Sequence, residues 1–171
     1  MSASIKIPDL DGARPAIAIL GHGGHGKDAA AAILARLCGL KVSSSSKFCA
    51  ARAVYPLVKD LYADAAACYR DRRNHRALWF HAITAYGFRP GPSLTEQILA
   101  ENHIYVGPRN LADFMLSRHL FNLVIWVDRS EILPPEPVGS MELSPDLADW
   151  FLDNNRTLDY LEAQILERLF G

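Results

Sequence analysis

The sequence predicts an α/β fold in which helices cover both faces of a central parallel sheet of about five strands. The first observation behind this prediction is the run Ala16–Leu20, which is wholly apolar, as in a strand buried on both faces, and ends at a glycine-rich turn. The second is the alternation of further short apolar segments with helical segments along the chain. Helical crossovers between parallel strands are expected to be right-handed.

The elements of the first half follow from local composition. Lys27–Cys38 is rich in alanine and leucine and precedes Gly39, so we expect a helix that ends at that glycine. The second strand is expected at Leu40–Ser43, followed by serines that suit a loop and a helix N-cap. A long helical region is expected over residues 47–86, broken or kinked at Pro56.

The second half continues the alternation. Gly87–Pro92 is a turn cluster, and Ser93 with Glu96 has the spacing of a capping box that opens a helix to about residue 102. The proline-rich segment Glu131–Ser144 is expected to be an exposed loop. The remaining strands are expected at His103–Val106, Asn122–Val127 and Trp150–Leu152, and the remaining helices at Leu111–His119 and Thr157–Phe170.

Composition excludes several classes of protein. The 171 residues are 50% hydrophobic and 22% charged, which excludes a disordered chain and suits one globular domain spanning residues 1–171. A net charge of −1 argues against a strongly basic, nonspecific nucleic-acid binder. Three scattered cysteines favour reduced thiols and offer no zinc spacing. Met1–Pro15 lacks the apolar core of a signal peptide, and no run is long enough to span a membrane, so we expect a cytoplasmic protein.

The pattern Gly21-x-x-x-x-Gly26-Lys27-Asp28 is that of a P-loop except at its last position. Its glycines let backbone N–H groups surround phosphate oxygens, and the helix that follows adds its positive N-terminal end. Lys27 is expected to reach the β- and γ-phosphates of ATP, and Asp28, in place of the usual Ser or Thr, to ligate Mg²⁺. The predicted nucleotide-binding residues are Gly21, His22, Gly23, Gly24, His25, Gly26, Lys27, Asp28 and Ala29. The two histidine side chains are expected to point to solvent.

Charged residues also follow the third and fourth expected strands, at the edge where parallel sheets bind ligands. Arg109 is expected to contact a transferring or acceptor phosphate, the alternative being a surface salt bridge to Asp113. Asp128 is expected to hold a magnesium-bound water or act as a base, the alternative being a capping carboxylate. Arg129 is expected to stabilise the transferring phosphoryl group.

A cluster of arginines at positions 70, 72, 73 and 76 suggests a phosphate clamp for the acceptor, contributed by Arg72, Arg73 and Arg76, although a solvated helix face would show the same pattern. Trp79 is a candidate for stacking on a base, or else a core residue. Asp71 is, with Asp28 and Asp128, a candidate proton acceptor should the substrate be an alcohol.

These segments together resemble the P-loop nucleotide kinases of bacteriophages. The resemblance rests on Gly26-Lys27-Asp28, the serine run 43–46, residues 71–76 with Trp79-Phe80, Ile104–Arg109, Val124–Asp128, and Asp153–Asn155 with Thr157-Leu158. It implies a three-layer P-loop kinase fold with ATP and Mg²⁺ as cofactors. It also implies an acceptor region at about 46–102 opened by Ser44 and Ser45, adenine held at Asn154, and a short lid-like loop at about 129–144.

The function implied by this resemblance is transfer of the γ-phosphoryl group of ATP. The short chain and the single arginine of the lid-like loop favour the 5-hydroxymethyl group of 5-hydroxymethyluracil in phage DNA as acceptor, in the host cytoplasm. One alternative is a kinase of free deoxynucleoside monophosphates. A second is a P-loop module that senses nucleotide without transferring phosphate.

Overall fold

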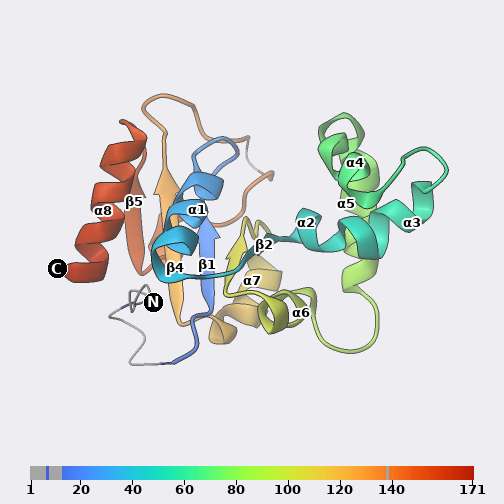
Figure 1. Cartoon of the computed structure of the whole chain (residues 1–171), viewed down its shortest axis with the longest axis horizontal. Coiled ribbons are helices and arrows are strands. Elements are labelled where there is room, and N and C mark those ends of the chain that lie inside the picture. Colours follow the sequence, from blue (N-terminus) through green and yellow to red (C-terminus); the bar gives the residue numbers. More distant parts are fainter. Residues whose placement is uncertain (1–6, 8–12, 138) are drawn as a thin grey trace.

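The computed structural model describes residue 7, residues 13–137 and residues 139–171. Within these ranges one sheet of five parallel strands has the order β2-β3-β1-β4-β5 (Figure 1). The strands are β1 (Ile17–Leu20), β2 (Val42–Ser44), β3 (Ile104–Val106), β4 (Leu123–Asp128) and β5 (Trp150–Asp153). The predicted fold class, a parallel α/β sheet flanked by helices, is confirmed.

The sheet lies between two helical layers because alternate side chains of each strand point to opposite faces. Ile17 and Ile19 of β1 belong to a core cluster shared with α1 (Lys27–Cys38) and α8 (Leu158–Phe170). Ala18 and Leu20 belong to a second cluster shared with α6 (Leu94–Glu101) and α7 (Leu111–Ser117) on the other face. All four β1 side chains are fully buried, so β1 anchors whatever follows its carboxyl end.

Local signals set the helix ends as the sequence predicts. The helix α1 has the predicted bounds and ends at Gly39, whose φ of 68° is the left-handed conformation that glycine adopts at no steric cost. Ser93 and Glu96 form the predicted capping box of α6. Ser44 caps α2 (Ser45–Cys49) by accepting a hydrogen bond from the Lys47 backbone N–H, which confirms the cap expected among the serines.

The predicted long helix over residues 47–86 is instead a chain of short pieces, which we call the helical arm (residues 45–87). After α2 come a π-helical turn at Ala50–Val54, α3 (Tyr55–Val58), α4 (Ala65–Arg70), a 3₁₀ turn at Arg72–His75 and α5 (Arg76–Gly87). Pro56 does not end the helical path, because it lies in the first turn of α3, where a backbone N–H has no partner within that helix. The break falls at residues 59–64.

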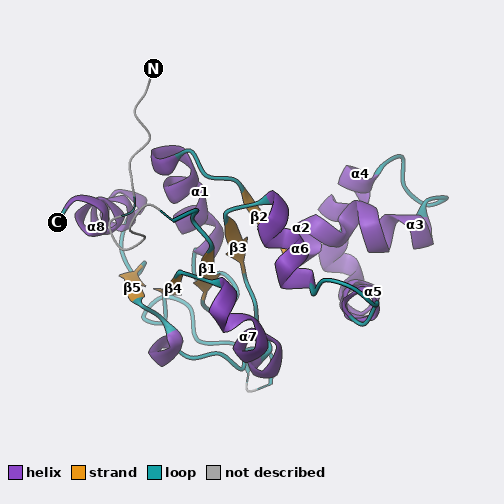
Figure 2. Ribbon diagram, turned by 90° about the horizontal axis from the view of Figure 1, so that it is seen from below, coloured by secondary structure: helices purple, strands orange, loops and turns teal. Residues whose placement is uncertain are grey.

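The helical arm has its own small core. Val54, Cys68 and Trp79 are its buried centre, separate from the two clusters that cover the sheet. Figure 1 shows the arm extending from the β2 edge, on the opposite side of the sheet from α8, and Figure 2 shows the same separation from below. The arm thus has a centre of its own, while Phe48, Cys49 and Tyr86 join it to the cluster that covers one face of the sheet.

Other differences from the predicted elements are small. The strand β2 begins two residues later than expected, and the helix predicted to run to His119 gives way to a 3₁₀ turn at Arg118–Leu120. The segment expected to be an exposed loop is exposed at residues 131–135, but Met141 and Leu143 are buried against the sheet. Most of Met1–Pro15 lies outside the described residues. Among the described helices, none is long and apolar enough to cross a membrane.

The packing of α8 on the sheet is testable with two leucines of that helix. Leu161 is fully buried, whereas Leu158, one turn earlier, is 61% exposed. We expect Leu161→Ala to lower the free energy of unfolding by about 3 kcal/mol, since it removes buried methyl groups and leaves a cavity. Leu158→Ala should cost less than about 0.5 kcal/mol. Urea unfolding followed by circular dichroism measures both, and equal losses would contradict the packing described.

Candidate functional site

The glycine-rich loop (Gly21–Gly26) joins the carboxyl end of β1 to the first turn of α1, as predicted. Gly26 has φ 97° and faces the Asn154 amide so closely that any Cβ would collide with it. A glycine is therefore required on both conformational and steric grounds. The tight turn leaves backbone N–H groups of the loop beside the N-terminus of α1, a combination that attracts anions.

The Lys27 ammonium lies along this loop. Its Nζ donates to the carbonyl oxygens of Gly21 and His22, at 2.7 and 2.6 Å. Burial, together with the positive charge of Arg109, lowers the pKa of Lys27 to about 8. A phosphate group beside it would raise this pKa again, so the protonation of Lys27 responds to an anion.

A carboxylate already occupies the open side of the loop. Glu136 accepts a hydrogen bond from the Gly23 backbone N–H at 2.7 Å, and Arg109 donates to both of its oxygens at 2.8 Å. Burial raises the pKa of the Glu136 carboxyl, but the bonds from Arg109 and Gly23 outweigh it and hold the pKa below its ordinary value. Arg109 thus pairs with Glu136 rather than with Asp113, which corrects the alternative considered for it.

The two histidines of the loop do not point to solvent as predicted. His25 is fully buried, accepts a hydrogen bond from the Arg129 backbone N–H at Nδ1, and donates from Nε2 to the Leu133 carbonyl. His22 accepts from the Glu136 backbone N–H, and burial with the neighbouring His25 lowers the pKa of His22. Both rings therefore hold the segment that follows β4 against the glycine-rich loop.

Asn154 supports the glycine-rich loop instead of facing an adenine ring. It is 4% exposed, its side chain donates to the His25 carbonyl at 2.9 Å, and its backbone N–H donates to the Asp128 carbonyl. The structure gives no support to the adenine role expected from the resemblance, because the amide is committed inside the protein. The sequence signal was weak, since asparagines after a strand are also typical of turns.

Asp128, at the end of β4, has the contacts of a capping carboxylate. It accepts from the Ser130 hydroxyl at 2.8 Å and the Ser130 backbone N–H, and Asn155 lies 3.3 Å away. Burial raises the pKa of this carboxyl, but these hydrogen bonds lower the pKa by more, so the net shift is downward. Asp128 therefore stays ionised and is a weak base. Next to it, the Nε of Arg129 is buried without a hydrogen-bond partner among the described residues.

Three of the four clustered arginines line a recess of about 260 Å³ on the helical arm, which we call the arginine recess. Its walls are Ser46, Arg72, Arg73, Arg76 and Trp79. Arg70 is outside it, and in the part of the chain that the structure describes no carboxylate pairs with the three arginines. Guanidinium groups without a carboxylate partner around a hollow suit the oxygens of a phosphate, and Arg72 is held there by the ring and the carbonyl of Tyr69.

The predictions for Trp79 and Asp71, both on the helical arm, need correction. Trp79 is 5% exposed and packs edge-on against Tyr69 in the core of the arm, so it has no free face on which a base could stack. Phe80, 66% exposed, is the aromatic side chain of the arm that faces outward.

Asp71 accepts hydrogen bonds from Tyr62 and Asn74 and pairs with His75. These contacts tie the arm together and lower the pKa of the Asp71 carboxyl. It therefore lacks the free oxygen and the basicity of a proton acceptor.

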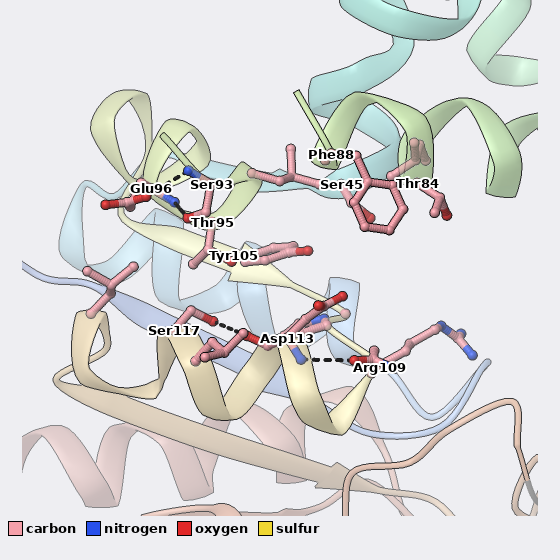
Figure 3. A pocket seen from close by; sticks show the side chains of 18 of the residues that line it. Ser45, Thr84, Phe88, Ser93, Thr95, Glu96, Tyr105, Arg109, Asp113 and Ser117 are labelled. Carbon is pink, nitrogen blue, oxygen red and sulfur yellow. Dashed lines mark hydrogen bonds between the residues drawn. The ribbon is translucent and has the colours of Figure 1, made fainter. Parts of the chain in front are cut away.

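A cleft of about 520 Å³ runs between the helical arm and α7, and Figure 3 shows the side chains that line it. One end is formed by Gly107, Pro108 and Arg109, directly after β3. Phe80, Phe88 and Tyr105 contribute aromatic surface, and Ser45, Thr84 and Ser117 contribute hydroxyl groups. Because Gly107 also lies beside the Lys27 side chain, and Arg109 reaches Glu136, this end of the cleft adjoins the glycine-rich loop.

Sequence reasoning missed several of these residues. Glu136 lies between prolines in a segment expected to be only an exposed loop, and nothing in the local pattern marks it as a partner of Gly23. Phe88 and the hydroxyl-bearing residues of the cleft gave no signal either. Ser46, which lines the arginine recess, lies in the predicted serine run, whereas the predicted acceptor residues of that run are Ser44 and Ser45.

Solved structures with a similar chain path include shikimate kinase from Aquifex aeolicus vf5, at 14% identity over 91% of this chain and 96% of that chain, with a TM-score of 0.46. The protein TT1252 from Thermus thermophilus is similar at 20% identity over 93% of this chain and 100% of that chain, also with a TM-score of 0.46. No protein-family model and no curated protein matches the chain. Likenesses of this degree assign no activity to it.

The supporting role of Asn154 can be tested without any ligand. Asn154→Ala removes the bond to the His25 carbonyl and leaves that buried oxygen unpaired, so we expect a loss of about 1–3 kcal/mol in the free energy of unfolding. Asn74→Ala is a matched control, since its exposed side chain bonds only Asp71 on the arm. Thermal unfolding in the absence of nucleotide measures both. An unchanged free energy of unfolding in Asn154→Ala would contradict the supporting role and make Asn154 a candidate for binding ligand again.

Proposed function

We propose that this protein is a magnesium-dependent kinase that transfers the γ-phosphoryl group of ATP to a nucleotide-type acceptor. The observation that carries the proposal is the oxyanion of Glu136 held by the Gly23 backbone N–H and Arg109 beside Lys27. A group of donors that binds a carboxylate in this way also suits the oxygens of a phosphate.

Three cationic residues of the site have a role in this proposal. Lys27 and the N–H groups of the glycine-rich loop bind the β- and γ-phosphates. Arg109 stands between that loop and the cleft, where charge accumulates on the transferring group, and the unpaired Nε of Arg129 is a second candidate to stabilise that charge. Transfer forms a bond between the acceptor oxygen and the γ-phosphorus and breaks the bond to the β–γ bridging oxygen, so ADP leaves. A hydroxyl acceptor releases its proton to solvent.

The carboxylate of Asp28 fits a site for Mg²⁺. It is exposed in the first turn of α1, and it makes no hydrogen bond or ion pair within the described residues. No cluster of three metal-ligating side chains occurs in the same described ranges, so most of the ligands would come from nucleotide and water, as is usual for Mg²⁺. When bound there, Mg²⁺ would neutralise charge on the β- and γ-phosphates.

The leading acceptor is 5-hydroxymethyluracil within DNA. The cleft has the size and the aromatic lining for one pyrimidine ring turned out of its strand. Arg109 lies at the end of the cleft that is next to the glycine-rich loop, where it bonds Glu136. The arginine recess is a separate hollow, which suits a neighbouring backbone phosphate. A free deoxynucleoside monophosphate is the alternative acceptor, favoured by the position of Arg109 at the end of the cleft, where it could bind a single phosphate.

The acceptor can be identified with ATP labelled at the γ-phosphate. We expect label to be transferred to DNA that contains 5-hydroxymethyluracil, and not to the same DNA with thymine. Arg73→Ala or Arg76→Ala should weaken binding of the modified DNA several-fold and make its salt dependence shallower by about one counterion per lost phosphate contact. Arg70→Ala is the matched control, since Arg70 lies outside the arginine recess.

Two other results would change the assignment. Conversion of a free deoxynucleoside monophosphate to its diphosphate, with modified DNA unlabelled, would replace the leading acceptor by the alternative. ATP binding without any acceptor-dependent release of ADP would show a nucleotide sensor and sink the proposed kinase.

The lowered pKa of Lys27 predicts a proton linkage. In the free protein the pKa of Lys27 is about 8, and phosphates should return the pKa toward the ordinary value of about 10.4. ATP binding should then take up about 0.7 proton at pH 8.5 and about 0.1 proton at pH 7, and affinity should fall as pH rises above 8. Calorimetry in two buffers of different ionisation enthalpy measures the uptake.

The control for this linkage is a lysine far from the loop. Lys27→Met should abolish the uptake at pH 8.5, whereas Lys59→Met, at the exposed end of α3, should keep it. An uptake of the same size in Lys27→Met would assign the proton to another group.

A further inference from the structure

The segment that follows β4, residues 129–136, makes a series of contacts with the glycine-rich loop. The Arg129 backbone N–H and the Leu133 carbonyl bond the two nitrogens of His25, at 3.0 and 2.9 Å. The Glu136 backbone N–H donates to His22 at 3.2 Å, and the Leu133 side chain lies against Gly24. The segment is therefore seated on the face of the loop where phosphates bind under the proposed function.

Glu136 is the charged contact in this series. Its carboxylate accepts hydrogen bonds from the Gly23 N–H and the Arg109 guanidinium, and its negative charge also raises the pKa of Lys27. These are the same three donors that the proposed function assigns to ATP phosphates. One carboxylate and one phosphate group cannot both occupy the Gly23 N–H.

The sequence around Glu136 favours this seated arrangement. Pro134 and Pro135 precede it and Pro137 follows it. Each proline fixes one backbone dihedral, so less conformational entropy is lost when the carboxylate is held in place. A seated carboxylate of one negative charge remains weaker than a polyphosphate, which brings several negative oxygens to the same donors.

We propose that residues 129–136 form an autoinhibitory latch in which Glu136 occupies the phosphate position of the glycine-rich loop and must leave before ATP binds. This inference rests on the proposed function for the identity of the ligand. The latch lowers the apparent affinity for ATP by the fraction of molecules in which it is open. If about one molecule in ten is open, removal of the carboxylate increases the affinity about tenfold.

The test measures binding of ATP and of pyrophosphate to the free protein by calorimetry. Glu136→Ala should bind both anions about three- to tenfold more tightly than the wild-type chain. Glu136→Gln should give a smaller gain, since its neutral oxygen still accepts from Gly23. Glu131→Gln is the control for loss of charge on the same segment, because no hydrogen bond or ion pair of that side chain is present in the described part of the protein, and it should bind ATP as the wild type does.

Hydrogen exchange supplies a second readout that needs no ligand. The Gly23 amide should exchange faster in Glu136→Ala than in the wild type, and ATP should restore its protection in both. An exchange rate unaffected by Glu136→Ala would overturn the latch.

The outcomes separate this inference from the proposed function. Unchanged or weaker binding of ATP to Glu136→Ala overturns the latch, and label transfer by the wild type would leave the kinase in place. Tighter binding without phosphate transfer by any variant supports the latch and overturns the kinase. Failure of every variant to bind either anion overturns both.

Discussion

The glycine-rich loop gathers positive groups that require a negatively charged partner, and the rest of the site depends on this constraint. The loop collects backbone N–H groups at the positive end of α1, and Lys27 and Arg109 add two cations beside them. Leaving such a group of donors without an acceptor costs free energy. Glu136 satisfies it in the free protein, and the proposed function has ATP satisfy it in the complex.

The rigid parts of the fold serve this constraint. The strand β1 is buried on both faces and fixes where the loop begins, while Asn154, at the end of β5, fixes its far side through the His25 carbonyl. His25, in turn, holds the chain that leaves β4. Support therefore comes from three neighbouring strands, β1, β4 and β5, which end at the same edge because they are parallel.

The parts that the sequence could predict are those determined by neighbours in the chain. The apolar run of β1, the glycine pattern and the cap of α6 each depend on residues within a few positions of one another. The partners of the loop do not: Gly23 and Glu136 are 113 residues apart, and Asn154 and His25 are 129 apart. Trp79 illustrates the same limit on the arm, since an aromatic residue at helical spacing suits a core and a stacking surface equally, and only the fold separates it from the exposed Phe80.

The division between sheet and arm has a consequence for how such a site could change its acceptor. The glycine-rich loop depends on the main core, whereas the arginine recess depends on the small core of Val54, Cys68 and Trp79. Under the proposed function, substitutions around this small core would alter acceptor binding while the loop and α1 stay intact. Arg109 is the residue that belongs to both sides, because it lines the cleft and bonds Glu136. Under the proposed latch, departure of Glu136 frees the same guanidinium to face a phosphate, so opening the loop to a nucleotide also changes the charge at the end of the cleft.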